Sequence, residues 1–481
     1  MSELSMTEVR DGLPIPQRYW AAATVATALT MAGLDGAIAN VALPTIARDL
    51  HASAASSIWV VNAYQLTTMV SLAPLASLGD IMGYRRIYWM GLAVFTVASL
   101  LCALSPSLLA LALARALQGF GAAGIMSVNS ALVRHTYPER MLGQGIGLNA
   151  LVIATSSAAG PTIASGVLAV ASWPWLFLIN VPIGLAALVL ALRSLPRTEP
   201  SRYPFDLPSA TLSALSFGLL ITAIDSLGHD LGLPVVLAEF AATAVLGTAL
   251  VRRQASLAVP VLPVDLFRRP IFALSALTST CSFTAQGIAF VSLPFYFQDV
   301  LGRSQVDTGL LLTPWPIAVG AMAPIAGRLA DRHPAGLLGA IGLATLAVGL
   351  VLLALLPPHP TTAEIVWRMV VCGLGFGFFQ SPNNRAIVTS VPLARAGNAG
   401  GVVSMARLLG QTTGAALVAL IFGVVSHTGR VAHGATITLV VAAGFAAAAC
   451  VVSSLRLMNF GDADPRGGAQ TAAGPRGAVR A

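Results

Sequence analysis

Two charged side chains lie in long apolar stretches of this sequence, where a charge is unusual. Asp35 lies about midway along residues 20–43, and Arg115 lies within residues 108–130. An isolated charge in hydrocarbon is costly, so a carboxyl group there either faces an aqueous cavity or carries a proton for part of the time. Asp35 could therefore exchange protons or attract a cationic substrate. The structural alternative is that Asp35 kinks its helix or hydrogen-bonds to a neighbouring helix.

Arg115 cannot escape the cost of burial by losing its charge, because a guanidinium stays protonated in proteins. It needs a counter-charge, backbone carbonyl oxygens or water. Asp35 is its most attractive counter-charge, although the two residues are far apart along the chain. A purely structural polar clamp is the alternative interpretation of Arg115.

A short charged turn joins two apolar stretches, residues 58–76 and 87–104. In this turn Asp80 can accept hydrogen bonds from backbone N–H groups at a helix start, and Gly83 allows a positive φ. A related turn recurs at residues 327–332. The charged residues and glycines that we single out in the two turns are Asp80, Gly83, Arg85, Arg86, Gly327, Asp331 and Arg332.

Further polar side chains fall inside apolar stretches and could line a substrate cavity or pack between helices. These cavity candidates are Asn40, Asn62, Tyr64, Gln118, Arg407 and Gln411. Arg407 and Gln411 are one helical turn apart, so they share a helix face.

The composition is that of a polytopic membrane protein. The chain has 481 residues, of which 56% are hydrophobic and only 10% charged, and its mean hydropathy is +0.79. All 27 basic residues are arginine, so a phosphate-binding loop that ends in Gly-Lys-Ser or Gly-Lys-Thr is excluded. Energy for transport must then come from a gradient or a separate subunit, and we predict no enzyme activity, cofactor or metal site. The four cysteines lie in apolar runs and are expected to be packing residues.

A helix needs about 20 apolar residues to cross the bilayer. On that basis we predict an all-α membrane fold with fourteen transmembrane helices. The predicted spans are residues 20–43, 58–78, 87–104, 108–130, 142–170, 176–192, 207–226, 231–251, 271–296, 309–329, 337–356, 365–388, 399–425 and 435–455.

The arginines indicate how these spans are oriented. If the chain starts inside, the cytoplasmic segments carry twenty arginines and the outer loops only three, Arg48, Arg303 and Arg430. Cytoplasmic loops of membrane proteins are enriched in basic residues, so we predict both termini inside and an inner-membrane location. The net charge of +8 therefore reflects orientation and does not indicate nucleic-acid binding.

The chain also repeats itself with a displacement of 254 residues. Pairs that follow this displacement are Pro138 and Pro392, Gly143 and Gly397, Gly147 and Gly401, Gly160 and Gly414, Gly119 and Gly373, and Gly121 and Gly375. Parallel repeats of this kind are one plan for a transporter, with the substrate between them. We predict a cytoplasmic segment (1–19), a six-helix bundle (20–196), two additional helices with linkers (197–269), a second six-helix bundle (270–456) and a disordered cytoplasmic tail (457–481). Residues 1–19 lack the short apolar core of a signal peptide.

Several motifs resemble those of a known family. Residues 34–44 are similar to the run L-D-x-T-I-V-N-V-A-L-P, with Ala37 in place of the threonine, and residues 115–122 match R-x-x-Q-G-x-G-A. The turns at 78–86 and 327–332 resemble G-x-L-A-D-R-x-G-R-R, and Gly160-Pro161 opens a stretch similar to G-P-x-x-G-G. The chain is identified as a member of the major facilitator superfamily, in its family of fourteen-helix drug:proton antiporters.

This resemblance implies a proton-coupled exporter of hydrophobic, cationic drugs or toxic compounds. Asp35 would take a proton from outside as substrate leaves, and Arg115 would bias that protonation. The turns around Asp80 and Asp331 would latch the two bundles on the cytoplasmic side, and the helix with Gly160 and Pro161 would favour export. The expected partners are a small-molecule substrate, protons and membrane lipid, with the protein as a monomer.

Other functions stay open at the level of sequence. A narrow exporter of one endogenous metabolite or antibiotic is the main alternative. A channel or a transport-related sensor on the same fold is an alternative from a different class. The two-copy turn argues against a lipid-linked precursor flippase.

Overall fold

The structure is a computed structural model that describes residues 12–196, 198, 205–227, 233–257, 264–391, 396–426 and 431–458. Of the two predicted terminal segments, residues 1–11 and 459–481 lie outside this part of the chain. The elements in chain order are α1 (Gln17–Asp49), α2 (Ala54–Ser57), α3 (Trp59–Met82), α4 (Tyr84–Ala103), α5 (Leu108–Ser127), α6 (Asn129–Thr136), η1 (Glu139–Met141), α7 (Leu142–Val170), α8 (Trp175–Leu178), α9 (Asn180–Ser194), α10 (Leu207–Ser226), α11 (Leu233–Ser256), η2 (Val264–Arg268), α12 (Pro270–Phe295), η3 (Tyr296–Val300), α13 (Gln305–Leu312), α14 (Pro314–Leu329), α15 (Ala335–Ala354), α16 (Thr362–Thr389), α17 (Ala396–Ser426) and α18 (Val431–Met458).

Twelve helices in the described ranges are long and apolar enough to cross a membrane, judged by length and composition. The predicted count of fourteen is therefore not confirmed. The two remaining predicted spans, 58–78 and 142–170, correspond to α3 and α7, but α3 is not among the twelve and α7 contributes only a short apolar segment, Ala159–Val170. In α3, polar side chains such as Asn62, Gln65 and Asp80 interrupt the apolar residues and lower its hydropathy. In α7 the described side chains form an unbroken stretch only over Ala159–Val170, which is shorter than a membrane span.

Several helices run past the predicted ends of their spans. The first span was expected at residues 20–43, yet α1 extends from Gln17 to Asp49 with Pro44 inside it. Hydropathy marks where hydrocarbon begins and ends, whereas a helix continues until its backbone hydrogen bonds are capped or broken.

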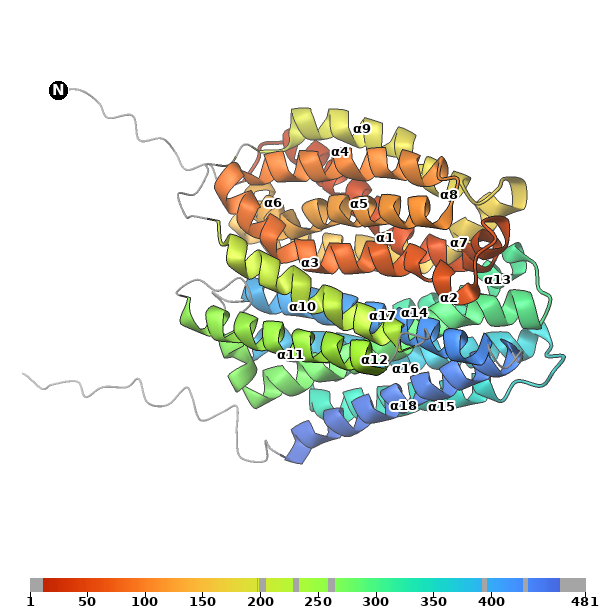
Figure 1. The fold of residues 1–481 in the computed structure, drawn as a ribbon. Helices are drawn as coiled ribbons and strands as arrows, with labels where there is room; N and C mark the ends of the chain where they lie inside the picture. Colours follow the sequence, from red (N-terminus) through yellow and green to blue (C-terminus); the bar gives the residue numbers. More distant parts are fainter. Residues whose placement is uncertain are drawn as a thin grey trace, which may run out of the picture.

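The helices form two groups that are separate in sequence. Helices α1 to α9 pack mainly against one another and form the first half, and α12 to α18 form the second half. Figure 1 shows the first half in the upper part of the view, in red to yellow, and the second half below it, in green to blue. Helices α10 and α11 pack against each other, and α10 also contacts α3 and α17, so this pair spans both halves at one side.

The repeated glycines perform the same task in both halves. A Cβ atom on Gly119 would lie 2.3 Å from the carbonyl oxygen of Tyr64, and one on Gly373 would lie 2.3 Å from that of Trp315. A Cβ atom on Gly121 or Gly375 would lie 2.5 Å from a backbone nitrogen of the crossing helix. Glycine is required at these four positions because the helix backbones touch, as is common between membrane helices. The repeat seen in the sequence is thus a repeat of helix crossings.

Candidate functional site

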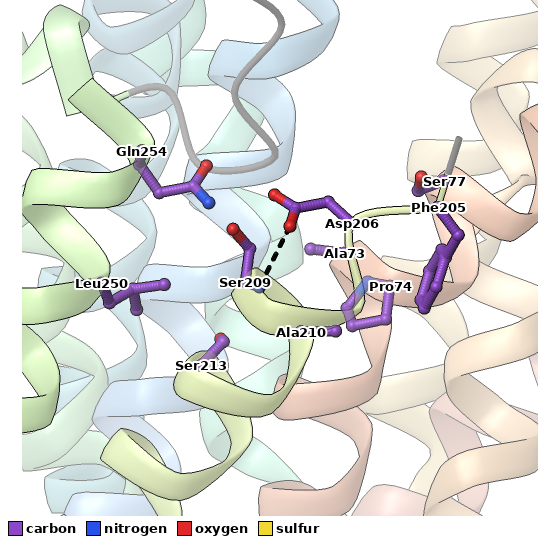
Figure 2. A pocket seen from close by; sticks show the side chains of 10 residues that line it. All are labelled: Ala73, Pro74, Ser77, Phe205, Asp206, Ser209, Ala210, Ser213, Leu250 and Gln254. Atoms are coloured by element: carbon purple, nitrogen blue, oxygen red, sulfur yellow. Dashed lines mark hydrogen bonds between the residues drawn. The ribbon is translucent and has the colours of Figure 1, made fainter. Parts of the chain in front are cut away.

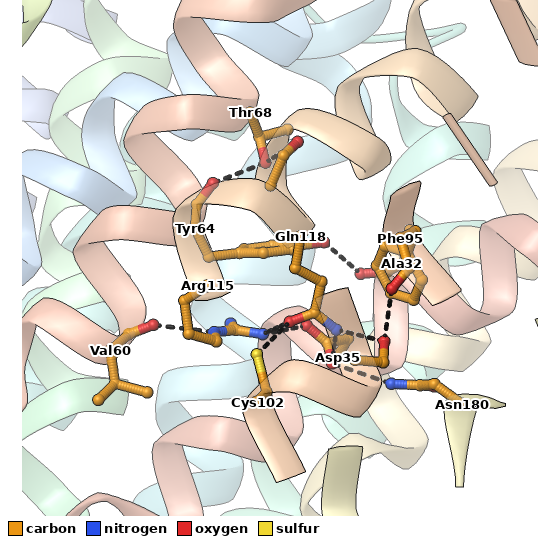
Figure 3. Close-up of polar contacts among 12 residues, drawn as sticks. Ala32, Asp35, Val60, Tyr64, Thr68, Phe95, Cys102, Arg115, Gln118 and Asn180 are labelled. Atoms are coloured by element: carbon orange, nitrogen blue, oxygen red, sulfur yellow. Dashed lines mark hydrogen bonds and ion pairs between the residues drawn. The ribbon is translucent and has the colours of Figure 1, made fainter. Parts of the chain in front are cut away.

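Asp35 lies at the centre of a polar cluster buried inside the first half. Its side chain is 1% exposed, and α1 brings it against α5 and α9. Three side chains donate to it: Arg115 forms an ion pair with Oδ2, while Gln118 Nε2 and Asn180 Nδ2 donate to Oδ1 at 2.9 and 3.1 Å (Figure 3). One guanidinium and two side-chain amides thus converge on the two carboxylate oxygens of Asp35.

Arg115 is fully buried; its Nε and Nη1 atoms have hydrogen-bond partners, whereas Nη2 has none. Its Nε donates to the carbonyl oxygen of Val60 at 2.9 Å, and Nη1 also donates to Gln118 Oε1 at 2.6 Å. The guanidinium carbon lies 4.2 Å from the centre of the Tyr64 ring, and the ring of Phe177 is 5.4 Å away. A cation over an aromatic face is stabilised further when water is excluded.

The ion pair makes the two residues depend on each other. Removing one partner of a buried pair typically costs about 3–5 kcal/mol, because the other charge is left without compensation. Asp35 and Arg115 therefore form one unit, as the sequence suggested, although their role in transport stays a prediction. Gln118, expected in a substrate cavity, belongs to this unit because both ends of its amide are engaged by Asp35 and Arg115.

Three residues of the cluster escaped the sequence analysis. Asn180 donates to Asp35, Ser99 accepts from Gln118 Nε2 at 2.9 Å, and the Cys102 thiol donates to Gln118 Oε1 at 3.5 Å. Asn180 could have been found, because it is an amide inside the predicted span 176–192. Ser99 and Cys102 are small residues whose role depends on which helix face meets α5, and that information is absent from the sequence.

The other cavity candidates lie on α1, α3 and α17, each of which contacts a helix of the other half. Tyr64 lies on α3 with its ring against the Arg115 guanidinium, and its hydroxyl donates to the carbonyl oxygen of Ala32 at 3.2 Å. Asn40 on α1 and Asn62 on α3 are buried. Arg407 and Gln411 lie on α17, which packs against α3 and α12.

Helix α7, which carries Gly160 and Pro161, joins the two halves. A Cβ atom on Gly160 would lie 2.5 Å from that of Ala37, so α7 presses closely on α1. The carbonyl oxygen of Pro161 would lie 2.5 Å from a Cβ atom on Gly309, and Ser165 Oγ donates to the carbonyl oxygen of Val306 in the second half at 2.9 Å. The motif therefore lies at a close contact between the two halves.

The hydrogen bonds between the halves, among the described residues, all lie at one end of the molecule. Gln298 is central: its Nε2 donates to the carbonyl oxygen of Val41 at 2.9 Å, and its Oε1 accepts from Thr45 and Arg48 at 3.3 and 3.2 Å. The remaining contacts here are Ser165 with Val306 and, at 2.8 Å, the hydroxyls of Thr162 and Thr313. This is the end opposite the charged turns, where α1 and α7 finish. Sequence analysis did not single out Gln298.

Comparison with known proteins identifies the architecture. The model of the Major Facilitator Superfamily matches residues 25–415. The chain belongs to the Major Facilitator Superfamily. It is 57% identical over 449 residues to the uncharacterized transporter YebQ of Escherichia coli K12, which covers 93% of this chain and 97% of YebQ.

More distant members of the Major Facilitator Superfamily differ in what their names say. The riboflavin transporter RibZ of Clostridioides difficile is 30% identical, over 82% of this chain and 85% of its own, and the multidrug efflux pump LfrA of Mycolicibacterium smegmatis is 34% identical, over 85% and 81%. The fold is also that of a solved bacterial homolog of the human lysosomal transporter Spinster, in an inward-facing, unoccupied conformation. The TM-score is 0.68 at 14% identity, over 92% of this chain and 97% of that chain. The chain is therefore a multi-pass membrane transporter rather than an enzyme.

The two charged turns of this superfamily member are held within their own halves. Asp80 accepts from the Tyr84 hydroxyl at 2.6 Å, Arg85 donates to the carbonyl oxygen of Leu192, and Gly83 has a φ of 91° that favours glycine. A Cβ atom on Gly83 would also lie 3.3 Å from the carbonyl oxygen of Thr198.

The second turn is tied by an ion pair. Asp331 pairs with Arg385 of α16, and both side chains are more than half exposed. Arg86 and Arg332 are exposed, and a Cβ atom on Gly327 would lie 3.4 Å from Ser381. Among the described residues, no hydrogen bond or ion pair of either turn joins the two halves, so the expected latch between them stays a prediction.

A separate pocket lies between α3, α10 and α11 (Figure 2). Its walls are mostly apolar or hydroxyl-bearing side chains, and its only acidic lining residue is Asp206. Partial burial opposes ionisation of Asp206, but hydrogen bonds from Ser209 and Arg253 outweigh it and hold its pKa below the usual range. The carboxylate of Asp206 thus forms an ion pair with Arg253 that links the start of α10 to α11.

Proposed function

We propose that this transporter is a proton-coupled exporter of hydrophobic small molecules that works by alternating access. The observation that carries the proposal is the buried Asp35 with its three donors. An acid that exists in a charged, paired form in one conformation can be neutral in another, and that difference couples proton binding to shape.

The position of Asp35 on α1 supports a route for this coupling. Asp35 and the inter-half contacts of Val41 and Thr45 belong to the same continuous helix. Protonation of Asp35 would remove the negative charge that pairs with Arg115 and accepts from Gln118 and Asn180. These interactions would weaken, and α1 could then shift. A shift of α1 would disturb the contacts with Gln298, which hold one end of the transporter closed.

The direction of export follows from the expected orientation. If the charged turns face the cytoplasm, the end held together by Gln298 faces outward, and we propose that Asp35 stays paired with Arg115 in this inward-directed state. Substrate enters from the cytoplasm, the two halves rock, and a proton from outside then neutralises Asp35 as substrate leaves. The proposed membrane topology keeps fourteen spans, with α3 and α7 included, and places both termini in the cytoplasm of an inner membrane.

Relatives support export without fixing the cargo. The name of LfrA describes multidrug efflux, and that of RibZ describes riboflavin transport. A narrow exporter of one metabolite or antibiotic is therefore the second candidate. The inward and outward movements proposed here are the same for both.

The test is proton-gradient-driven dye efflux in inverted membrane vesicles. Asp35→Asn keeps the size and one acceptor oxygen but cannot carry a negative charge, so we expect gradient-driven transport to fall to background. Asp307→Asn, a change of an exposed acid on α13, is the matched control and should transport normally. An Asp35→Asn protein that pumps at the wild-type rate would remove this role, and movement against a gradient that survives a protonophore would contradict proton coupling.

A further inference from the structure

Arg407 is a guanidinium between the two halves that has no acid to balance it. It lies on α17 of the second half, its Nε is buried without a hydrogen-bond partner, and none of the described carboxylates forms an ion pair with it. Tyr64, on α3 of the first half, is close enough to interact with Arg407 electrostatically. A charge in this position is costly unless something else compensates it.

Two buried arginines show how this fold compensates a structural arginine, whereas Arg407 is only partly buried. Arg115, which lies over the Tyr64 ring, is neutralised by Asp35, although its Nη2 atom has no hydrogen-bond partner. Arg456 on α18 has no carboxylate either, but its guanidinium donates to Ser275, Asn383 and Ser453, at 2.8, 2.8 and 2.5 Å. Arg407 has neither kind of compensation, so a clamp between helices does not explain it.

Unpartnered polar atoms lie on the helix that Arg407 faces. Both side-chain polar atoms of Asn62 and the Oε1 atom of Gln65 are buried and lack hydrogen-bond partners. Val60 and Tyr64 use the face of α3 that meets α5, as their carbonyl oxygens show. With 3.6 residues per turn, Asn62 and Gln65 lie on a different face of α3 from the one that meets α5, and α3 also packs against α17 and α10.

These observations give the region between α17 and α3 a net positive charge. Asp35 is already paired with Arg115 and accepts hydrogen bonds from two amides, so its carboxylate is not available to a substrate in this state. The expectation of a cationic substrate therefore loses its basis. A guanidinium pairs best with a planar, delocalised anion through two parallel hydrogen bonds. The amides of Asn62 and Gln65 add both donors and acceptors beside it.

We propose that Arg407 selects an organic anion as the transported substrate, with a carboxylate or a similar planar anionic group seated between α17 and α3. This inference rests on the proposed export function and specifies the charge of its cargo. The anionic group binds Arg407, and the polar part of the same molecule contacts Asn62 and Gln65. Tyr64, whose ring lies against the Arg115 guanidinium, connects this region to the Asp35 and Arg115 pair.

The test compares a fluorescent carboxylic acid with its methyl ester, which lacks only the charge. In inverted vesicles with an imposed proton gradient, we expect the wild type to move the acid roughly tenfold faster than the ester or more, as expected for one charged hydrogen-bond partner. Arg407→Gln should abolish that preference while it still moves the ester, and Arg407→Lys should retain part of it. Arg368→Gln is the control, because Arg368 donates to a carbonyl oxygen of its own helix.

A binding measurement separates the failure of this inference from that of the proposed function. In detergent, the acid should raise the thermal unfolding temperature of the wild type more than the ester does, and this difference should vanish in Arg407→Gln but persist in Arg368→Gln. Equal shifts by acid and ester in the wild type, or an unchanged preference in Arg407→Gln, would overturn the inference. Gradient-independent movement of both probes together with an acid-specific shift would overturn the transport mechanism alone.

Discussion

The two halves share a backbone plan but not a chemistry. Gly121 and Gly375 mark equivalent helix crossings, yet the displacement of 254 that relates them places Met369 and Cys372 opposite Arg115 and Gln118. Met369 and Cys372 are fully buried and apolar, whereas Arg115 and Gln118 hold the charge of Asp35. The comparison teaches that symmetry supplies two bodies with similar helix crossings, whereas the Asp35–Arg115 pair belongs to the first half alone and Arg407 to the second.

The largest expected effect comes from making the first half resemble the second. Arg115→Met leaves Asp35 buried without its counter-charge, so we expect a loss of about 3–5 kcal/mol in stability. The double variant Arg115→Met with Asp35→Asn should recover most of this loss, because no charge is left and the asparagine oxygen still accepts from Gln118 and Asn180. Thermal unfolding in detergent measures both.

Met369→Leu provides the matched control in the second half. A swap of similar volume at a buried apolar site typically costs less than about 1.5 kcal/mol. If Arg115→Met unfolds no earlier than Met369→Leu, the ion pair does not distinguish the halves.

A smaller and equal effect is expected where the halves agree. Gly121→Ala and Gly375→Ala each place a Cβ atom 2.5 Å from a backbone nitrogen, so both crossings must open. We expect a loss of about 1–3 kcal/mol for each, as for other overpacked sites. Gly444→Ala, where no atom lies within 4 Å of the new Cβ, should leave the unfolding temperature unchanged or slightly raised. A marked loss for only one crossing would mean that the two halves are not packed alike.

The smallest effect concerns α10 and α11, which belong to neither half. Asp206 and Arg253 join them at 2.8 Å, with 18% and 40% of their side chains exposed, so the pair contributes no more than about 1 kcal/mol. Because the pKa of Asp206 is lowered in the folded state, this contribution is complete above its usual value of about 3.9 and is lost as the pH falls through the lower value.

Asp206→Asn tests that contribution as a function of pH. We expect a slightly lower unfolding temperature than the wild type at pH 7 and a difference that disappears in acid. A constant difference at all pH values would assign it to packing instead of charge. Ser213→Ala in the same pocket, which removes no charge, is the control.

Much of the fold could be predicted from the order of the residues. Apolar runs of about 20 residues separated by polar turns predict membrane helices, and Gly83 with Asp80 predicts a tight turn; both depend on local interactions. The fourteen-helix count is not confirmed: α3 has too many polar side chains to meet the hydropathy of a span, and α7 is described without a break only over Ala159–Val170. The repeated glycines were visible as a pattern, but their backbone partners were not.

The sequence by itself determined that charge would be buried in a membrane and that a carboxyl group and a guanidinium needed compensation. The cost of a charge in hydrocarbon depends on residue type and on neighbours along the chain, so it can be read without coordinates. Only the tertiary structure decided how each charge is compensated. Asn180 reaches Asp35, Gln298 reaches Val41, and Arg407 faces Tyr64 without an acid. These contacts join residues more than a hundred positions apart, and packing of helix faces, which no local pattern specifies, brings them together.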